Sequence, residues 1–491
     1  MYESTRGNLS GQNASQAITS GMVPSGGLFV PSTIPNLNWQ ELQGLTYRDV
    51  AKRVMSPYLS DFSEVTLSEI VNVYANGTFD EINPAPLVSV GDFGVLELWH
   101  GPTAAFKDMA LQVLPDLLKE SLKLVHLDQD VLILVATSGD TGKAALEGFK
   151  NRDGMHIVVF YPEGGVSPVQ ERQMTTTDGV NTHVVAVKGN FDECQAAVKR
   201  IFASENLKTQ LLKKDLVFSS ANSINWGRLL PQIVYYFWAY LQAVEQGKII
   251  AGESMNVVIP TGNFGNLQAA YYAKRMGLPL GRIICASNKN NVLVDFFDTG
   301  VYQSERAFYQ TISPSMDILV SSNFERFLFE MSGRNAKQIL TWYDAKNQGT
   351  FTVDPVTLKQ CQETVYAGWA SEEETRETIS RSYQAYQYVF DPHTAVGMKV
   401  YEDYLATTHD QTYTVIASTA SPFKFASNVL SALEGKKEVS LRDEWAALAE
   451  LSQLTGWKIP LGLQGLDKKP AKAVESCEPE GIAEVLRKMF V

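Results

Sequence analysis

The sequence predicts an α/β fold built on open, mostly parallel sheets. Short apolar runs of strand length alternate along the chain with longer stretches of helical spacing, which is the pattern of βαβ units. The apolar runs are continuous, as expected for strands that are buried on both faces of a parallel sheet. Several of them end in polar, glycine-containing turns that open the next helix. In α/β folds these turns are where ligands bind.

Composition narrows the class of protein further. The chain has 491 residues, a 45% hydrophobic share and a formal net charge of −12, which argues against nucleic acid or an anionic membrane surface as a partner. The four cysteines lie far apart without C-x-x-C spacing, so we expect reduced thiols in a cytoplasmic protein. No metal site is expected. The N-terminus lacks a signal-peptide pattern, and the longest apolar run, Ile233 to Leu241, is too short to span a bilayer.

Residues 1–95 are expected to form an accessory N-terminal segment. A turn within 25–31 feeds a short extended piece, and 38–55 and 66–74 carry helical spacing. A strand is then predicted over 95–99, and this strand delivers the polar stretch that follows.

Lys107 is the first candidate for chemistry. The stretch 100–108 is a turn that leads into a helix expected over 108–122, with a kink at Pro115. Lys107 therefore lies at a helix N-terminus beside Phe106, and both the helix dipole and the apolar neighbour favour its neutral amine. A neutral amine can form an imine with an aldehyde. The alternative is a lysine that simply extends from a helix start into solvent.

The rest of the chain repeats the βαβ pattern and then departs from it. Strands are predicted over 131–136, 157–160, 182–187, 255–260, 282–287 and 413–417, and helices over 143–150, 192–205, 224–246 and 267–276. The strand signal fades over 317–388, where we expect a helical insertion. A tail from about 436 has helical spacing at 442–455 and 481–489, and the Lys/Pro-rich piece 468–473 is expected to be a linker.

The loop Thr261–Asn266 is a candidate phosphate site. Gly262 and Gly265 allow close approach of the backbone, so successive N–H groups at the helix start can bind a phosphate. The loop is neither a P-loop nor a G-x-G-x-x-G fingerprint, and a plain strand–helix turn is the alternative. Thr419, which follows the last strand, is a weaker signal, because a hydroxyl at a strand end is often only a turn former.

Two more polar clusters open helices. Thr137–Gly142 suits a carboxylate or phosphate of a substrate, although Asp140 would repel an anion unless it faces elsewhere; an ordinary N-cap cluster is the alternative. In Asn222–Arg228, Ser223 could simply cap the helix. Arg228 would then lie one turn along on the same face, where it could make a bidentate contact to a phosphate.

Eight motifs match one family in order from end to end, which makes the match specific. They are Ser4–Gly7, Gly26–Pro31, His100–Asp108, Thr137–Gly142, Asn222–Arg228, Gly262–Asn266, Asp391–Gly397 and Ser418–Thr419. On these residues the whole chain resembles the threonine synthases.

The resemblance implies a pyridoxal 5'-phosphate enzyme of the tryptophan-synthase-β-like fold (fold type II). It implies that Lys107 is the Schiff-base lysine and that Thr419 hydrogen-bonds the pyridine nitrogen. The residues that would hold the cofactor phosphate are Gly262, Asn263, Phe264, Gly265 and Asn266. Those that would bind the substrate are Thr137, Ser138, Thr141, Asn222, Ser223 and Arg228.

Three positions qualify the resemblance. Cysteine-synthase-like relatives have Asn where this chain has Asp140, and that Asn contacts the ring oxygen of the cofactor; aspartate favours the threonine synthase branch and makes Asp140 a cofactor-binding candidate. The family often has His where this chain has Ser421, which puts any role of that histidine in doubt. His393, in the Asp391–Gly397 motif, is expected to be structural, not catalytic.

The resemblance also implies an activity and a domain plan. The reaction would convert O-phospho-L-homoserine and water to L-threonine and phosphate, the last step of threonine biosynthesis. A large cofactor-binding domain would comprise 96–128 and 222–435, a small mobile domain over 129–221 would close on the substrate, and 436–491 would form a helical tail. We expect a monomer, with a dimer as the alternative. The functional alternatives are a phospholyase or dehydratase on the same fold and a non-catalytic ligand-binding paralogue.

Overall fold

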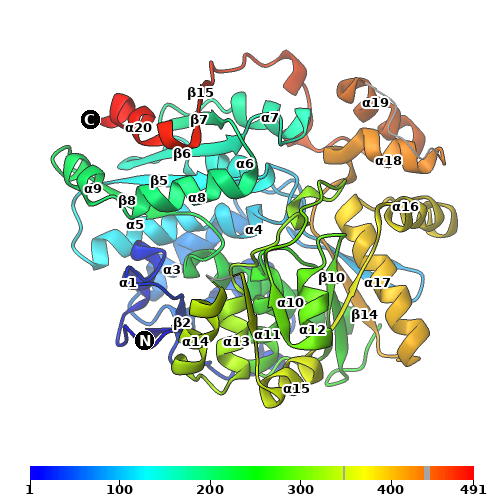
Figure 1. Cartoon of the computed structure of the whole chain (residues 1–491). Helices are drawn as coiled ribbons and strands as arrows, with labels where there is room; N and C mark the ends of the chain where they lie inside the picture. The colour runs from blue at the N-terminus through cyan, green and yellow to red at the C-terminus, as the bar shows by residue number, and fades with distance from the viewer. Residues whose placement is uncertain (347–348, 436–442) are drawn as a thin grey trace.

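Two open sheets form the frame of the computed structural model, which describes residues 1–346, 349–435 and 443–491 (Figure 1). The larger sheet has the strand order β13-β10-β9-β14-β4-β3, and only β3 runs antiparallel to its neighbour. Its strands are β3 (Leu87–Val90), β4 (Phe93–Glu97), β9 (Met255–Pro260), β10 (Leu280–Ser287), β13 (Val365–Trp369) and β14 (Thr414–Ser418). The α/β fold class with mostly parallel sheets is confirmed.

The smaller sheet is parallel throughout, in the order β15-β7-β6-β5-β8. Its strands are β5 (Asp130–Ala136), β6 (Met155–Pro162), β7 (Thr182–Val187), β8 (Leu216–Ser220) and β15 (Glu475–Cys477). Every residue of β9 and β14, and all of β5 after Asp130, is buried. Continuous apolar runs therefore mark these central strands because no face of them reaches solvent.

Helices connect the parallel strands of both sheets. The smaller sheet and its helices form the smaller unit, and the larger sheet and its helices form the larger unit. In the smaller unit the helices are α6 (Asp140–Phe149), α7 (Pro168–Thr175), α8 (Phe191–Phe202) and α9 (Glu205–Leu212). In the larger unit they include α10 (Trp226–Glu245), α11 (Gly265–Arg275), α12 (Val292–Thr299) and α17 (Pro392–Thr408). Among the described helices, none has the length and apolar character needed to cross a membrane.

The N-terminal segment packs against the larger unit (Figure 1). It contains the antiparallel pair of β1 (Tyr2–Ser4) and β2 (Phe29–Pro31), with α1 (Ala14–Ser20) between them in the chain. The helices α2 (Tyr47–Met55) and α3 (Glu64–Ile70) follow. The Tyr2 ring meets the Trp226 ring of α10 edge-on at 5.3 Å between centroids. Arg334 donates to the Pro31 carbonyl at 2.6 Å and pairs with Glu3 at 2.7 Å. The segment thus joins residues that lie more than 300 positions apart in the chain.

The helix expected over 108–122 is two helices. The structure has α4 (Asp108–Leu111) and α5 (Leu114–Leu124), not one kinked helix. Pro115 has no N–H with which to bond the Leu111 carbonyl, so the hydrogen-bond ladder stops there. The carbonyl left free at Leu111 faces Gly148 of α6.

The region 317–388, expected as a helical insertion, is mostly helical but also supplies two strands that the sequence analysis did not predict. It holds α13 (Phe324–Met331), α14 (Ala336–Lys346), α15 (Pro355–Thr364), α16 (Glu372–Tyr386) and β12 (Thr350–Thr352), which pairs with β11 (Val301–Gln303). It also holds β13, the edge strand beside β10. As a short edge strand with only one buried residue, β13 shows no continuous apolar run.

The tail is likewise not purely helical. After α18 (Ala426–Leu433), it contains α19 (Glu444–Thr455), β15 and α20 (Ile482–Phe490); the expected start of the tail at 436 and of its first helix at 442 lies outside the described residues. The expected linker 468–473 lies against the smaller unit, where Lys472 Nζ donates to the Gly179 carbonyl at 2.6 Å and to Thr182 Oγ1 at 2.8 Å.

We predict that Gly148→Ala destabilises the fold. A Cβ at Gly148 would lie 2.1 Å from the Leu111 carbonyl oxygen, a backbone atom that cannot move alone. Such a contact puts the cost at the upper end of the roughly 1–3 kcal/mol known for overpacking. That cost exceeds the gain of about 1 kcal/mol of alanine over glycine in a helix. The urea midpoint of unfolding should therefore fall.

Gly397→Ala in α17 is the matched control. Its Cβ would have its nearest neighbour at 3.4 Å, which is an ordinary contact, so the midpoint should stay the same or rise. Equal midpoints for both variants and the wild type would contradict the close packing of α6 on Leu111.

Candidate active site

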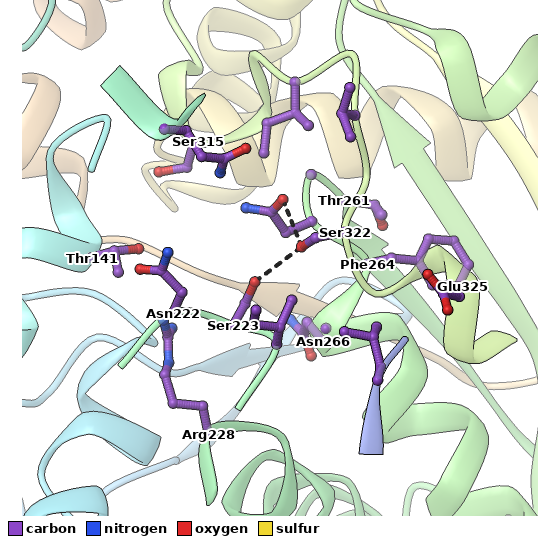
Figure 2. A pocket seen from close by; sticks show the side chains of 18 of the residues that line it. Thr141, Asn222, Ser223, Arg228, Thr261, Phe264, Asn266, Ser315, Ser322 and Glu325 are labelled. Carbon is purple, nitrogen blue, oxygen red and sulfur yellow. Dashed lines mark hydrogen bonds between the residues drawn. The ribbon is translucent and has the colours of Figure 1, made fainter. Parts of the chain in front are cut away.

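One cavity of about 390 Å³ opens where the two sheets meet (Figure 2). Its walls include the carboxyl ends of β5 and β9 and the residue that follows β14. The predicted site residues that line it are Lys107, Thr137, Ser138, Thr141, Asn222, Ser223, Arg228, Gly262, Asn263, Phe264, Gly265, Asn266 and Thr419. The fold therefore gathers every predicted site residue except Asp140 around one space.

Lys107 reaches this cavity from the start of α4, with its side chain 11% exposed. The Phe106 N–H donates to the Thr419 carbonyl at 2.8 Å and fixes the lysine loop beside the end of β14. Lys107 Nζ donates to Ser315 Oγ at 3.4 Å and lies 3.9 Å from Asp140 Oδ2. Burial lowers the pKa of Lys107 to about 8, although the Asp140 charge opposes this. Near pH 8 much of the amine is therefore neutral, as a nucleophile requires.

The loop after β9 brings backbone donors to the cavity. Phe264 has φ of +63° and forms the N-cap of α11, and its ring packs against Phe324 at 5.1 Å between centroids. A Cβ at Gly262 would lie 2.5 Å from the Ser315 carbonyl oxygen, so a side chain is excluded there. The first N–H groups of α11 have no acceptor within the helix, which makes this loop suitable for an anion.

Asn266 adds a side-chain donor to the same loop. Its Oδ1 accepts hydrogen bonds from the hydroxyls of Tyr235, at 2.6 Å, and Tyr236. These bonds fix the amide, and its Nδ2 is buried without a partner among the described residues. An unused buried N–H donor beside a helix N-terminus is what a phosphate group would satisfy.

Arg228 is a buried cation on the cavity wall. It is 3% exposed, its Nη1 donates to the Ala221 carbonyl at 3.0 Å, and its Nε has no partner within the described part of the chain. Burial lowers the pKa of Arg228 to about 10, so it stays charged near neutral pH. Figure 2 shows Thr141, Asn222 and Arg228 along one side of the cavity. This side suits an anionic group of a ligand.

Ser223 does not cap the following helix. Asn225 does so, because its side chain accepts from the Gly227 N–H at 2.9 Å. Ser223 instead shares a hydrogen bond of 3.3 Å with Ser322, whose hydroxyl donates to Asn263 Oδ1 at 3.1 Å (Figure 2). Ser223 thus belongs to the link between the cluster at 222–228 and the loop after β9.

Thr137 shapes the loop that follows β5. Its Oγ1 accepts from the N–H groups of Gly139, at 2.9 Å, and Gly142, at 2.8 Å. Gly139 has φ of +129°, and a Cβ there would lie 2.4 Å from the Gln170 side chain. The N-cap position of α6 is Gly139, which has no capping side chain, and Thr137, two residues before it, accepts from the Gly142 N–H. Ser138 and Thr141 line the cavity.

Asp140 is not among the residues that line the cavity. Its carboxylate pairs with Lys424 at 2.5 Å and accepts from Gln170 Nε2 at 3.0 Å and from Ser315 Oγ at 3.1 Å. The sequence analysis required this carboxylate to face away from any anion bound at the loop. The structure meets that requirement.

Thr419 lies at the cavity, 5% exposed, directly after β14. Its neighbour Ser418 accepts from Trp99 Nε1 at 3.1 Å and so anchors the strand end. Ser421, where the family often has histidine, is buried and caps the short 3₁₀ helix that follows, accepting from the Phe423 N–H at 3.4 Å.

The loop 313–322 forms a wall that the sequence analysis missed. Ser315 and Ser322 line the cavity from it, and no strand end or glycine pattern marks it in the sequence. His393, also on the cavity wall, accepts from the Ser315 N–H at 3.2 Å through Nε2, while its Nδ1 hydrogen-bonds Asp391 at 2.7 Å. The only sequence feature that pointed to this contact was the Asp391–Gly397 motif, which contains His393.

The N-terminal segment supplies another missed wall. Arg6, Gly26 and Gly27 line the cavity, and Arg6 pairs with Glu325 at 2.9 Å. Lys346 lines the same side, and burial lowers its pKa to about 8. Lys107 and Lys346 thus both line the cavity with lowered pKa values, and Lys107 is the one beside the end of β14.

Comparison with known proteins finds relatives along the whole chain. The family model of pyridoxal-phosphate dependent enzymes matches residues 80–419, and those of the threonine synthase N terminus and C-terminal region match 1–74 and 394–456. Threonine synthase of Schizosaccharomyces pombe is 38% identical over 477 residues, which covers 90% of this chain and 91% of that protein. Threonine synthase-like 1 of Macaca fascicularis is 41% identical over 440 residues, which covers 86% of this chain but only 58% of that relative's length.

A solved structure agrees with these matches. The crystal structure of pyridoxal-phosphate-bound threonine synthase from Brucella melitensis superimposes with a TM-score of 0.86 at 34% identity, covering 100% of this chain and 99% of that one. A buried lysine and an open glycine loop at the meeting of two sheets are thus set in a chain that matches this family from end to end. The chain belongs to the threonine synthase family of pyridoxal-phosphate-dependent enzymes.

Proposed function

We propose that this protein converts O-phospho-L-homoserine and water to L-threonine and phosphate, and that it does so in the cytoplasm as a monomer. One observation carries the proposal: Lys107, the glycine loop and the buried Arg228 line a single cavity. The first two suit an aldehyde cofactor with a phosphate, and the third suits a substrate with a second anionic group. The names of the relatives support the same reaction.

The cavity fits pyridoxal phosphate. Gly262 has no room for a Cβ beside the Ser315 carbonyl oxygen, so the backbone of the loop comes close to the cavity wall. Asn266 Nδ2 and the N–H groups at the start of α11 offer donors for the phosphate. Lys107 would offer the amine, and Thr419, which lines the same cavity, would hold the pyridine nitrogen. When bound, the cofactor supplies an electron sink that stabilises negative charge next to the substrate amino group.

The chain's own residues supply proton transfer and charge control. The reaction removes protons from Cα and then Cβ and releases phosphate from Cγ. A proton then returns to Cγ, water adds at Cβ, and a proton returns to Cα. Lys107 Nζ is the base for the Cα proton, since its lowered pKa leaves it neutral near working pH. A neutral Thr419 hydroxyl, unlike a carboxylate, leaves a pyridine nitrogen unprotonated, which disfavours side reactions.

The cavity walls must bind the substrate phosphate and must also keep bulk water out. Thr141, Asn222, Ser223 and Arg228 form the set proposed to hold the substrate phosphate. Because the cavity lies between the two sheet units, closing of the 129–221 unit would exclude bulk water until phosphate leaves.

A second candidate function is a phospholyase that gives 2-oxobutanoate, ammonia and phosphate from the same substrate. It stays as the alternative because one similar protein, from Macaca fascicularis, is named threonine synthase-like 1 and not threonine synthase. The two functions differ only in what happens after phosphate leaves, so the cavity geometry alone fits both.

We predict that the purified protein forms threonine from O-phospho-L-homoserine only when pyridoxal phosphate is present. Amino-acid analysis should show threonine as the main product, with 2-oxobutanoate, measured by its reduction with NADH, as a minor one. Plain homoserine should not react, since hydroxide is a poor leaving group. 2-Oxobutanoate in excess over threonine would replace the proposed function with the phospholyase.

We predict that pyridoxal phosphate becomes attached to Lys107 when the loaded protein is reduced with borohydride, as shown by mass spectrometry of the labelled peptide. The rate of cofactor uptake should fall about tenfold per pH unit below pH 8, because the pKa of Lys107 is about 8 and only the neutral amine reacts. Lys107→Ala should lose both the label and threonine formation. Lys346 is the internal control, because its pKa is also lowered to about 8; label on Lys346 would refute the assignment.

We predict that Arg228→Ala lowers kcat/KM for O-phospho-L-homoserine by roughly 10- to 150-fold. A charge-assisted hydrogen bond contributes about 1.5–3 kcal/mol, which corresponds to that range. Cofactor absorbance should be unchanged. Arg228→Lys should recover only part of the loss, because an ammonium cannot reproduce the planar fork of arginine. Unchanged kinetics in Arg228→Ala would mean that other residues hold the substrate phosphate.

A further inference from the structure

A buried ion pair that the proposed mechanism does not use lies next to Lys107. Asp140 Oδ1 and Lys424 Nζ are 2.5 Å apart, and the two side chains are 3% and 0% exposed. Asp140 begins α6 after a strand of the smaller sheet, whereas Lys424 follows β14 of the larger sheet. Neither residue lines the cavity. The pair therefore joins the two units directly behind the lysine.

The two oxygens of Asp140 face different partners. Oδ1 meets Lys424 and accepts from Gln170 Nε2 at 3.0 Å. Oδ2 accepts from Ser315 Oγ at 3.1 Å and lies 3.9 Å from Lys107 Nζ. Lys424 also donates to the Thr103 carbonyl at 3.0 Å, which fixes its ammonium on the far side of the carboxylate. One oxygen thus faces a permanent cation and the other faces the reactive amine.

The charges that act most strongly on Lys107 come from two acidic and two basic side chains. Asp108 on α4 and Asp140 on α6 are negative, while Arg228 on α10 and Lys424 are positive. His393 on α17 reaches the same loop only as an acceptor for the Ser315 N–H. Burial would raise the pKa of Asp140, but the charges of Lys424 and Lys107 and the bonds from Lys424 and Gln170 hold it well below its usual range.

Loss of the Lys424 charge would remove one of the two positive charges that act most strongly on Lys107. The Asp140 carboxylate would then face Lys107, 3.9 Å away, without the ion pair to Lys424. A nearby unbalanced carboxylate favours the ammonium form of a lysine. The ammonium form can neither bond an aldehyde carbon nor accept a proton from a substrate.

We propose that Lys424 is a positioning residue whose charge holds the Asp140 carboxylate and so keeps the Lys107 amine neutral and available. The inference rests on the proposed function only in taking Lys107 as the reacting amine. Lys424 touches neither the cavity nor any group in it and acts through Asp140. The arrangement also explains how this chain has aspartate where cysteine-synthase-like relatives have a neutral asparagine: the added negative charge comes with its own counter-ion.

The test measures the pKa of Lys107 in the full chain freed of cofactor. The rate of acetylation of Lys107 by acetic anhydride is followed against pH by mass spectrometry of its peptide, and the acid limb of kcat/KM is followed for the loaded enzyme. Lys424→Met should raise the pKa of Lys107 by about one unit or more, the shift expected from a neighbouring charge. Asp140→Asn should lower it. The double variant, which removes both charges, should return it close to the wild-type value.

Opposite shifts in the two single variants distinguish charge control from a role in folding, which would move neither pKa in a set direction. Lys143→Gln is the matched control, because Lys143 is also buried on α6 and pairs with Glu147 at 2.9 Å, yet it is not on the cavity wall. It should leave the acetylation profile unchanged.

If Lys424→Met does not fold, the fall in Asp140→Asn and its reversal in the double variant carry the same test. Unchanged profiles in the folded variants, or shifts of the same sign in both single variants, would overturn the proposal. Acetylation does not depend on turnover. Opposite shifts without threonine formation would therefore support the role of Lys424 and refute the proposed function, and threonine formation without shifts would do the reverse.

Discussion

A lysine amine can be buried only if it is neutral or paired with an opposite charge, and the residues around the cavity meet this requirement for Lys107. Lys107 lies at the meeting of two sheets, where each unit contributes a wall, and its side chain is 11% exposed. Burial is the largest cause of its lowered pKa of about 8, and the charges of Arg228 and Lys424 lower that pKa further. The serine loop at 313–322, the histidine that binds it and the ion pair behind it are all arranged around this one amine. The site needs a neutral nucleophile and several hydrogen-bond donors that bind anions. Because the chain as a whole is acidic, the charged side chains next to the site must supply the balance.

The central strands and the loops at their ends could be predicted from sequence, because both leave local signals. Strands such as β5 and β9 are buried on both faces, so their apolar runs are continuous. Edge strands leave no such run, which is why β13 and β15 were missed. Pro115 was predicted to kink a single helix, whereas the structure has two helices, α4 and α5, at this place.

The residues of the candidate site also divide into those that the sequence predicts and those that it does not. The glycine loop, the hydroxyl cluster at 137–142 and Lys107 stand out because each combines residue types that matter with a strand end or helix start. Ser315 and Lys424 do not stand out. A serine in a loop is unremarkable, and a lysine becomes informative only when its buried partner, 284 residues away in sequence, is known. The roles of the predicted residues follow from the resemblance, whereas their convergence follows from the fold.

The position of β15 bears on how the protein folds during synthesis. This strand pairs with β7 at the edge of the smaller sheet, yet it is made after all the other described strands. While the ribosome is still extending the chain, the smaller sheet therefore has only its first four strands, and the backbone edge of β7 is open. An open edge can pair with an edge strand of another molecule. The closing stretch of this sequence thus acts as a late cover for that edge, and a chain truncated before β15 would keep it exposed.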